Sequence, residues 1–152
     1  MQSFPATIIL RHRKENLKKC SLRGLECRND FIFYSYPGDF PEFPNYILLD
    51  LEGEPLSPAD SDKGLFILDA TWRYAGKMCK FVESKQTWIK RSIPHQWRTA
   101  YPRRQNDCPN PEQGLASIEA IYASYKLLGR DTSGLLDTYH WKEEFLTKNI
   151  NF

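Results

Sequence analysis

The pattern of apolar and polar positions predicts strands that alternate with helices, followed by helices alone. Short apolar runs rich in aromatic and β-branched residues are typical of strands, and they occupy residues 7–10, 31–34, 46–51, 64–68 and 87–90. Apolar residues at helical spacing predict helices over residues 72–82, 115–128, 135–139 and 141–146. This order of elements indicates an α/β fold with a mostly helical C-terminal part.

The stretch from Leu65 to Met78 organises this pattern. A continuous apolar run ends at Asp69, and a helix follows for which Thr71 is a candidate N-cap. Ligand sites of α/β proteins lie where the carboxyl end of a strand meets the free N–H groups of a helix start. The stretch therefore predicts a ligand site, and the alternative is a buried strand and an amphipathic helix without one.

Two further segments have a recognisable form. Ser57 followed by Pro58 is typical of a helix N-cap with proline at the first helical position. Residues 92–112 form a long polar segment with several prolines, and loops of this length in a compact domain are functional or disordered.

Composition narrows the class of protein. The 152 residues suit one compact unit, and no apolar run reaches the roughly 18 residues that a membrane helix needs. The N-terminus has no secretory signal pattern, and the four cysteines form no C-x-x-C pair. We therefore expect a cytoplasmic protein with no membrane partner, no metal and no disulfide framework.

Positive charge is unevenly distributed along the chain. Six Lys or Arg residues between Arg11 and Leu25 face only Glu15, and six more between Ser84 and Asn106 face no acid. Such segregation predicts a basic surface that follows phosphates. The alternative is a set of solvated loops whose charges are scattered in space.

Several enzyme classes lack their signatures here. The chain has no G-x-x-x-x-G-K-[ST], no G-x-G-x-x-G and no G-x-S-x-G motif. The three histidines, His12, His95 and His140, have no nucleophile nearby in the sequence, so we interpret them as surface or core residues.

Short motifs in a fixed order resemble those of DTW-domain proteins and of related small-subunit rRNA enzymes. Residues 68–78 resemble the D-x-T-W-x-x-A-x-x-M signature, and residues 114–120 resemble the second DTW motif, L-[ST]-[ST]-x-E-A. Residues 19–22, 56–60 and 135–149 resemble the rRNA enzymes instead. The N-terminal cysteine cluster of many DTW-domain tRNA enzymes is missing, and the arginines of segment 93–104 follow the DTW pattern.

The resemblance implies a SPOUT-like sheet with a deep trefoil knot. Residues 1–91 would be the α/β part, and residues 92–152 the knot loop and the helical part of the same compact unit. It also implies S-adenosylmethionine as donor of a 3-amino-3-carboxypropyl group to N3 of a uridine or pseudouridine in rRNA or tRNA. The alternatives are a SPOUT-type RNA methyltransferase and a non-catalytic RNA-binding ribosome-assembly factor. Both a monomer and a homodimer stay open.

Particular residues carry this hypothesis. Because uracil N3–H is a weak acid, the reaction needs a base, and Asp69 is the first candidate and Asp60 the second. The expected cofactor contacts are Ser21, Ser57, Asp69, Trp72, Ile93, Pro94 and Ser117. The expected contacts to RNA phosphates are Lys18, Lys19, Arg23, Arg103 and Arg104.

Three of these interpretations have a structural alternative. Trp72 is either a wall of the cofactor slot or a plain core residue. Asp69 is either functional or only a turn residue or helix cap. Glu119 is expected to be structural, because a carboxylate within a helix can hold a loop by hydrogen bonds.

Overall fold

The core of the fold is a parallel sheet. The computed structural model describes residues 4–14, 22–101 and 115–152. In these residues, five strands form one all-parallel sheet in the order β2-β1-β4-β3-β5. The strands are β1 (Thr7–His12), β2 (Phe31–Tyr36), β3 (Tyr46–Pro55), β4 (Gly64–Asp69) and β5 (Ile89–Ser92).

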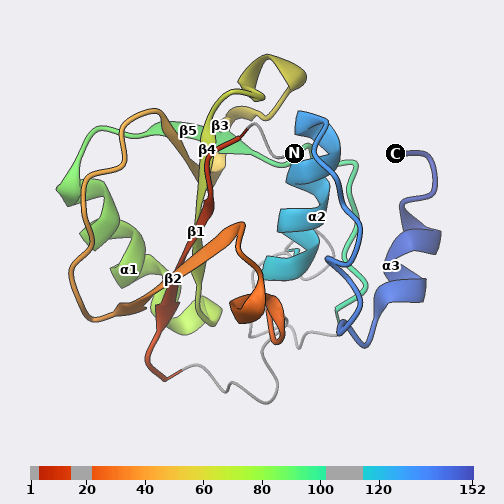
Figure 1. Ribbon diagram of the computed structural model, residues 1–152, viewed down its shortest axis with the longest axis horizontal. Helices are drawn as coiled ribbons and strands as arrows, with labels where there is room; N and C mark the ends of the chain where they lie inside the picture. The colour runs from red at the N-terminus through yellow and green to blue at the C-terminus, as the bar shows by residue number, and fades with distance from the viewer. Residues whose placement is uncertain (1–3, 15–21, 102–114) are drawn as a thin grey trace.

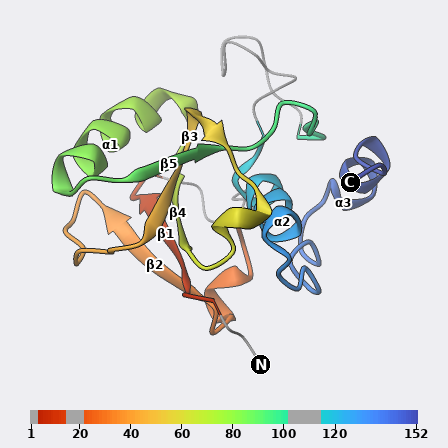
Figure 2. The same ribbon diagram turned by 90° about the horizontal axis from the view of Figure 1, so that it is seen from above.

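Helices cover both faces of this sheet. Helix α1 (Trp72–Lys85) packs on one side, and α2 (Ser117–Leu128) lies on the other, with α3 (Lys142–Lys148) outside it (Figure 1). The view from above shows the same separation of α1 from α2 and α3 (Figure 2). Two short 3-10 helices, η1 (Leu25–Cys27) and η2 (Pro58–Asp60), lie in the connections.

Burial on both faces explains why the central strands are apolar at nearly every position. Ile9 and Ile67 belong to the core cluster that includes α2, whereas Leu10 and Phe66 belong to the cluster that includes α1. Side chains of a strand alternate between the two faces. Asp69 therefore lies on the α2 side of the sheet, two residues beyond Ile67.

The sequence predicted the type of most elements but not all of their ends. The five predicted strands are confirmed, and β3 extends beyond the predicted residue 51 to Pro55. The helix predicted over 135–139 is wrong. That stretch is a series of turns. Gly134 has a positive φ of 81°, and the main-chain hydrogen bonds join residues three positions apart, as from the Tyr139 N–H to the Leu136 carbonyl.

The expected SPOUT-like sheet with a deep trefoil knot is also wrong. The residues that the structure describes form the single five-stranded parallel sheet and three α-helices given above, and they show no such knot. The expectation came from short motifs. Such motifs determine local turns and caps, whereas a knot depends on the path of the whole chain. No helix in the described part of the chain is long and apolar enough to cross a membrane.

Candidate functional site

Asp69 lies at the carboxyl end of the central strand β4 and is only 3% exposed. Arg11 Nε donates a hydrogen bond to Asp69 Oδ2 at 3.0 Å. On the other side, the Ser117 hydroxyl donates to Asp69 Oδ1 at 3.2 Å. Arg11 is the β1 residue paired with Asp69 in register, and Ser117 is the first residue of α2. A strand end, a neighbouring strand and a helix start thus fix both carboxylate oxygens.

The guanidinium of Arg11 is itself held in place. Its Nη1 donates to Glu26 Oε2 at 3.0 Å, and its Cζ lies 4.6 Å from the centre of the Phe33 ring. Partial burial acts to raise the pKa of Glu26, but hydrogen bonds from backbone amides and from Arg11 hold that pKa below its ordinary value. The side chain of Arg11 is 12% exposed, so its pairing with Asp69 is largely shielded from solvent.

Asp60 is held by different neighbours. Its Oδ2 accepts from the Ser57 backbone N–H at 3.3 Å and from Arg91 Nε at 3.2 Å, while Ser57 Oγ accepts from the Ala59 N–H. This is a capping box on η2, and it confirms Ser57 as an N-cap. Asp60 precedes β4 and Asp69 ends it, and their described contacts share no residue. The structure does not bring Asp60 and Ser57 together with Asp69.

Ile93 and Pro94 follow β5 and are half-buried. The Ile93 main-chain N–H and C=O groups make no hydrogen bond to the residues that the structure describes. The Pro94 carbonyl accepts from Trp97 N–H at 3.1 Å, which closes a turn directly after them.

Glu119 fastens the segment that follows this turn, and its expected structural role is confirmed. The carboxylate is fully buried and accepts four hydrogen bonds. Oε1 accepts from Thr99 Oγ1 at 2.6 Å and from Ala116 N–H at 2.8 Å. Oε2 accepts from Ala100 N–H at 2.8 Å and from the Tyr139 hydroxyl at 2.9 Å. All four donors are neutral groups. Through them the carboxylate connects the loop at Thr99 and Ala100, the start of α2 and the turn at Tyr139.

A second clamp holds the same segment from the C-terminal helix. Asn149 Oδ1 accepts from the Arg98 N–H at 2.8 Å, and Asn149 Nδ2 donates to the Arg98 carbonyl at 2.9 Å. Lys148 Nζ donates to the Thr99 carbonyl at 3.3 Å. Sequence reasoning did not predict this clamp: Asn149 ends the motif over residues 135–149, but its partner Arg98 is 51 positions away.

Several predicted site residues cannot be placed. Ser21, Lys18, Lys19, Arg103 and Arg104 lie outside the described residues. Trp72 begins α1, but its side chain is likewise outside what the structure describes. Arg23 is exposed in the turn before η1. Thr71 occupies the N-cap position of α1 without a side-chain cap, and its carbonyl accepts from Tyr74 N–H at 3.0 Å.

Arg11 is the residue of this site that sequence reasoning missed. The available signal was the charge of Arg11 at the end of an otherwise apolar strand. Because buried charges in proteins are paired, such a residue indicates an acidic partner. Its partner Asp69 is 58 positions away. The order of the strands was needed to bring the two together.

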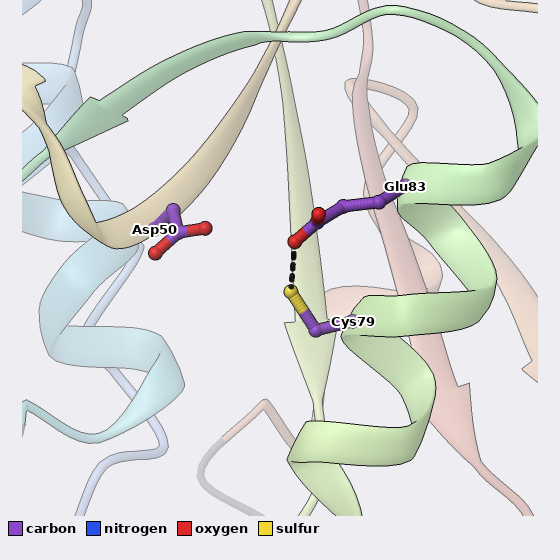
Figure 3. A group of neighbouring side chains, drawn as sticks. All are labelled: Asp50, Cys79 and Glu83. Carbon is purple, nitrogen blue, oxygen red and sulfur yellow. Dashed lines mark hydrogen bonds between the residues drawn. The ribbon is translucent and has the colours of Figure 1, made fainter.

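Three potential metal ligands gather beside α1. One ligand atom each from Asp50, Cys79 and Glu83 lies within 4.8 Å of the others, and the Cys79 thiol donates to Glu83 at 3.0 Å (Figure 3). Lys90 Nζ pairs with Glu83 at 3.2 Å and with Asp50 at 3.6 Å. Burial, together with Glu83, raises the pKa of the Cys79 thiol to about 12. The ammonium group of Lys90 thus pairs with both acids of this cluster.

The fold defines an α/β protein with a parallel sheet and polar groups at the carboxyl end of its central strand. No protein-family model and no curated protein sequence matches the chain. Among solved structures it is similar to the one described as the SAM-dependent rRNA:acp-transferase Tsr3 from Vulcanisaeta distributa. The TM-score is 0.74 at 23% identity, over 97% of this chain and 79% of that chain. At this identity the likeness shows the fold.

These comparisons correct the expected resemblance to DTW-domain proteins. No family model supports it, and the solved structure that matches is described as an rRNA:acp-transferase. The D-x-T-W stretch consists of a strand end, an N-cap position and a helix start, and local geometry of this kind occurs in many α/β proteins. The motif therefore had little power to separate one family from another.

Proposed function

We propose that this protein transfers an aminocarboxypropyl group from S-adenosylmethionine to rRNA. Two observations support the proposal. The fold is similar, over nearly the whole chain, to that of the SAM-dependent rRNA:acp-transferase Tsr3. The sheet also presents an oriented carboxylate at the place where α/β proteins bind ligands.

The single observation that carries the proposal is the fixed position of Asp69. Arg11 and Ser117 hold its two oxygens from opposite sides, so the carboxylate needs no reorganisation when a substrate arrives. A catalytic group held in advance in this way contributes by proximity and orientation. The contacts of Asp69 reach a neighbouring strand and a helix start on the same face of the sheet, which supports a role beyond that of a turn residue.

The finer proposal is that the acceptor is N3 of a uridine or pseudouridine. A bond forms between N3 and the side-chain carbon next to sulfur, and the carbon–sulfur bond breaks with its electron pair passing to sulfur. The N3 proton leaves to a base, for which we propose Asp69. Asp60 is the weaker candidate because its carboxylate caps η2 and pairs with Arg91.

The chain also offers groups for the donor. The free main-chain N–H and C=O of Ile93 suit the edge of an adenine ring, with Pro94 beside it. Ser117 lies next to Asp69 and belongs to the same site. Trp72, Ser21 and the phosphate contacts Lys18, Lys19, Arg23, Arg103 and Arg104 stay proposals from the sequence. S-adenosylmethionine supplies an electrophilic carbon activated by its sulfonium group.

The test uses donor labelled at two different positions. With purified protein and small-subunit rRNA, label in the carboxyl group should enter RNA, whereas label in the methyl group should not. Methyl label in RNA would replace the proposal by a methyltransferase. Binding of RNA without binding of the donor would identify a non-catalytic RNA-binding factor.

A further inference from the structure

An aromatic stack lies at the same end of the sheet as Asp69. His12 ends β1 directly after Arg11, and its ring stacks on Tyr74 in the first turn of α1, with ring centres 4.2 Å apart and planes 18° apart. Tyr36 ends β2 and pairs with His12 in register, and the centres of their two rings are 5.5 Å apart. The side chains of successive strand residues point to opposite faces, so Arg11 faces α2 and His12 faces α1.

Local contacts fix the ring of His12. Its Nδ1 accepts a hydrogen bond from the Lys14 backbone N–H at 3.1 Å, and the side chain is 7% exposed. Burial, together with the charges of Lys14 and Arg13, lowers the pKa of His12. The imidazole is therefore a buried backing for Tyr74, which is itself only half-buried.

Positive charge surrounds Tyr74. Lys14 Nζ lies 5.5 Å and Arg73 Cζ 5.9 Å from the centre of its ring. Arg13 and Lys77 are exposed, one beside Lys14 in the chain and the other three residues after Tyr74 on α1. No ion pair joins any of these four cations to a carboxylate in the part of the chain that the structure describes.

Other cations near α1 behave differently. Lys85 pairs with Asp39, Lys90 with Glu83, and Arg91 with Asp60. The cations without a described ion pair at the start of α1 and the end of β1, unlike the exposed Lys80 farther along α1, lie around the half-buried ring of Tyr74.

We infer that Tyr74, backed by His12 and surrounded by Arg13, Lys14, Arg73 and Lys77, is a stacking surface for an unpaired base of the RNA substrate. Bases of single-stranded RNA stack on aromatic side chains while cations hold the phosphates beside them. The surface lies one strand residue beyond Arg11, so the stacked base belongs to a nucleotide that flanks the modified one. This inference rests on the proposed function for the identity of the partner, and it adds that the acceptor segment is single-stranded.

The experiment compares variants on one RNA in two forms. The probe is a short RNA with a fluorescent adenine analogue next to a uridine, used as a single strand and annealed to its complement. The variants are Tyr74→Leu, which keeps apolar bulk without a ring, and Tyr74→Phe, which keeps the ring. The double substitution Lys14→Ala with Arg73→Ala tests the cations. Lys126→Ala is the matched control, because Lys126 is an exposed cation on α2.

The wild type should bind the single strand more tightly than the duplex and quench the analogue. Tyr74→Leu should lose about tenfold in affinity and most of the quenching, whereas Tyr74→Phe and Lys126→Ala should bind like the wild type. The double variant should flatten the dependence of log affinity on log salt by roughly 1.4, the value for two phosphate contacts on a single strand.

Unchanged binding and quenching by a folded Tyr74→Leu protein would overturn the inference, as would equal binding of single strand and duplex. Transfer of carboxyl label to RNA, measured in the same samples, separates this result from failure of the proposed function. Normal transfer with no effect at Tyr74 rejects the stacking surface alone. Absence of transfer by the wild type, with tyrosine-dependent binding of the single strand, rejects the transferase and retains the RNA surface.

Discussion

The two ends of strand β4 each carry a buried aspartate paired with an arginine, but the two aspartates have different neighbours. Before the strand, Asp60 pairs with Arg91 at 3.2 Å, and at its end Asp69 pairs with Arg11 at 3.0 Å. Both aspartates are almost fully buried. Asp60, however, caps its own helical turn through Ser57, three residues away, whereas Asp69 binds Ser117 from a distant helix.

The difference shows that burial and an arginine partner do not identify a functional carboxylate. Location and range of contacts separate the two residues: one closes a local turn, and the other joins β1, β4 and α2 where a parallel sheet presents its strand ends. If this comparison is right, replacing Asp69 should affect chemistry, and replacing Asp60 should affect stability.

The largest expected effect is on transfer by Asp69→Asn. Loss of a general base lowers turnover by about 100-fold or more, while cofactor affinity should stay within about tenfold. Transfer of carboxyl label and equilibrium binding of S-adenosylmethionine measure the two quantities. Near-normal turnover by this variant would remove the base role from Asp69. Asp60→Asn, assayed in parallel, should retain transfer wherever it is folded.

Glu119→Gln should have the largest effect on stability. The glutamine amide keeps one acceptor oxygen and replaces the other by an NH₂ group. If Oε2 is replaced, the NH₂ group faces the donors Ala100 N–H and Tyr139 O–H, which then have no acceptor. If Oε1 is replaced, the same happens to Thr99 O–H and Ala116 N–H. We expect a loss of about 2–3 kcal/mol in the free energy of unfolding, measured by urea denaturation. A stability equal to wild type would show that this loop needs no carboxylate, and that Glu119 must be considered for chemistry beside Asp69.

A smaller loss of stability is expected for Asp60→Asn. The amide oxygen can still cap Ser57, but the charge pairing with the partly exposed Arg91 is lost. We expect about 1–2 kcal/mol by urea denaturation. Arg91→Met should have a similar effect, and the double variant should lose less than the sum because the two side chains interact. Strict additivity would argue against the pairing.

The smallest expected effect is a pH dependence at the Asp69 end of the sheet. Burial lowers the pKa of His12, so the unfolded chain binds this proton more readily than the folded protein does. The stability that this residue contributes is present above the unfolded value, about 6.5, and is lost as pH falls through the folded pKa. The urea midpoint should therefore fall from neutral pH toward mildly acidic pH.

The control for this effect is His12→Phe, which keeps an aromatic ring against Tyr74 but cannot titrate. Its urea midpoint should change less over the same pH range than that of the wild type. Parallel curves for the two proteins would show that His12 makes no contribution to the pH dependence.

The sequence by itself determined the elements and one end of the site. Period-two and helical spacing are local properties, and so are the capping preferences of Ser57 and the break at Asp69, so each could be predicted within a few residues. The sequence predicted that Glu119 holds a loop by hydrogen bonds, but only its bond to Ala116 is local, and its other three donors are 19 or 20 positions away. The turns at 135–139 were missed because their apolar spacing imitates a helix.

The tertiary structure decided which of these residues act together. Asp69 meets Arg11 and Ser117 across 58 and 48 positions of sequence, and these contacts exist only because β4 lies beside β1 and α2 covers that face. The separate neighbours of Asp60 and Asp69 and the stack of His12 on Tyr74 depend on the same strand order. Local patterns carry no information on that order, because pairing of parallel strands is set by packing over the whole chain.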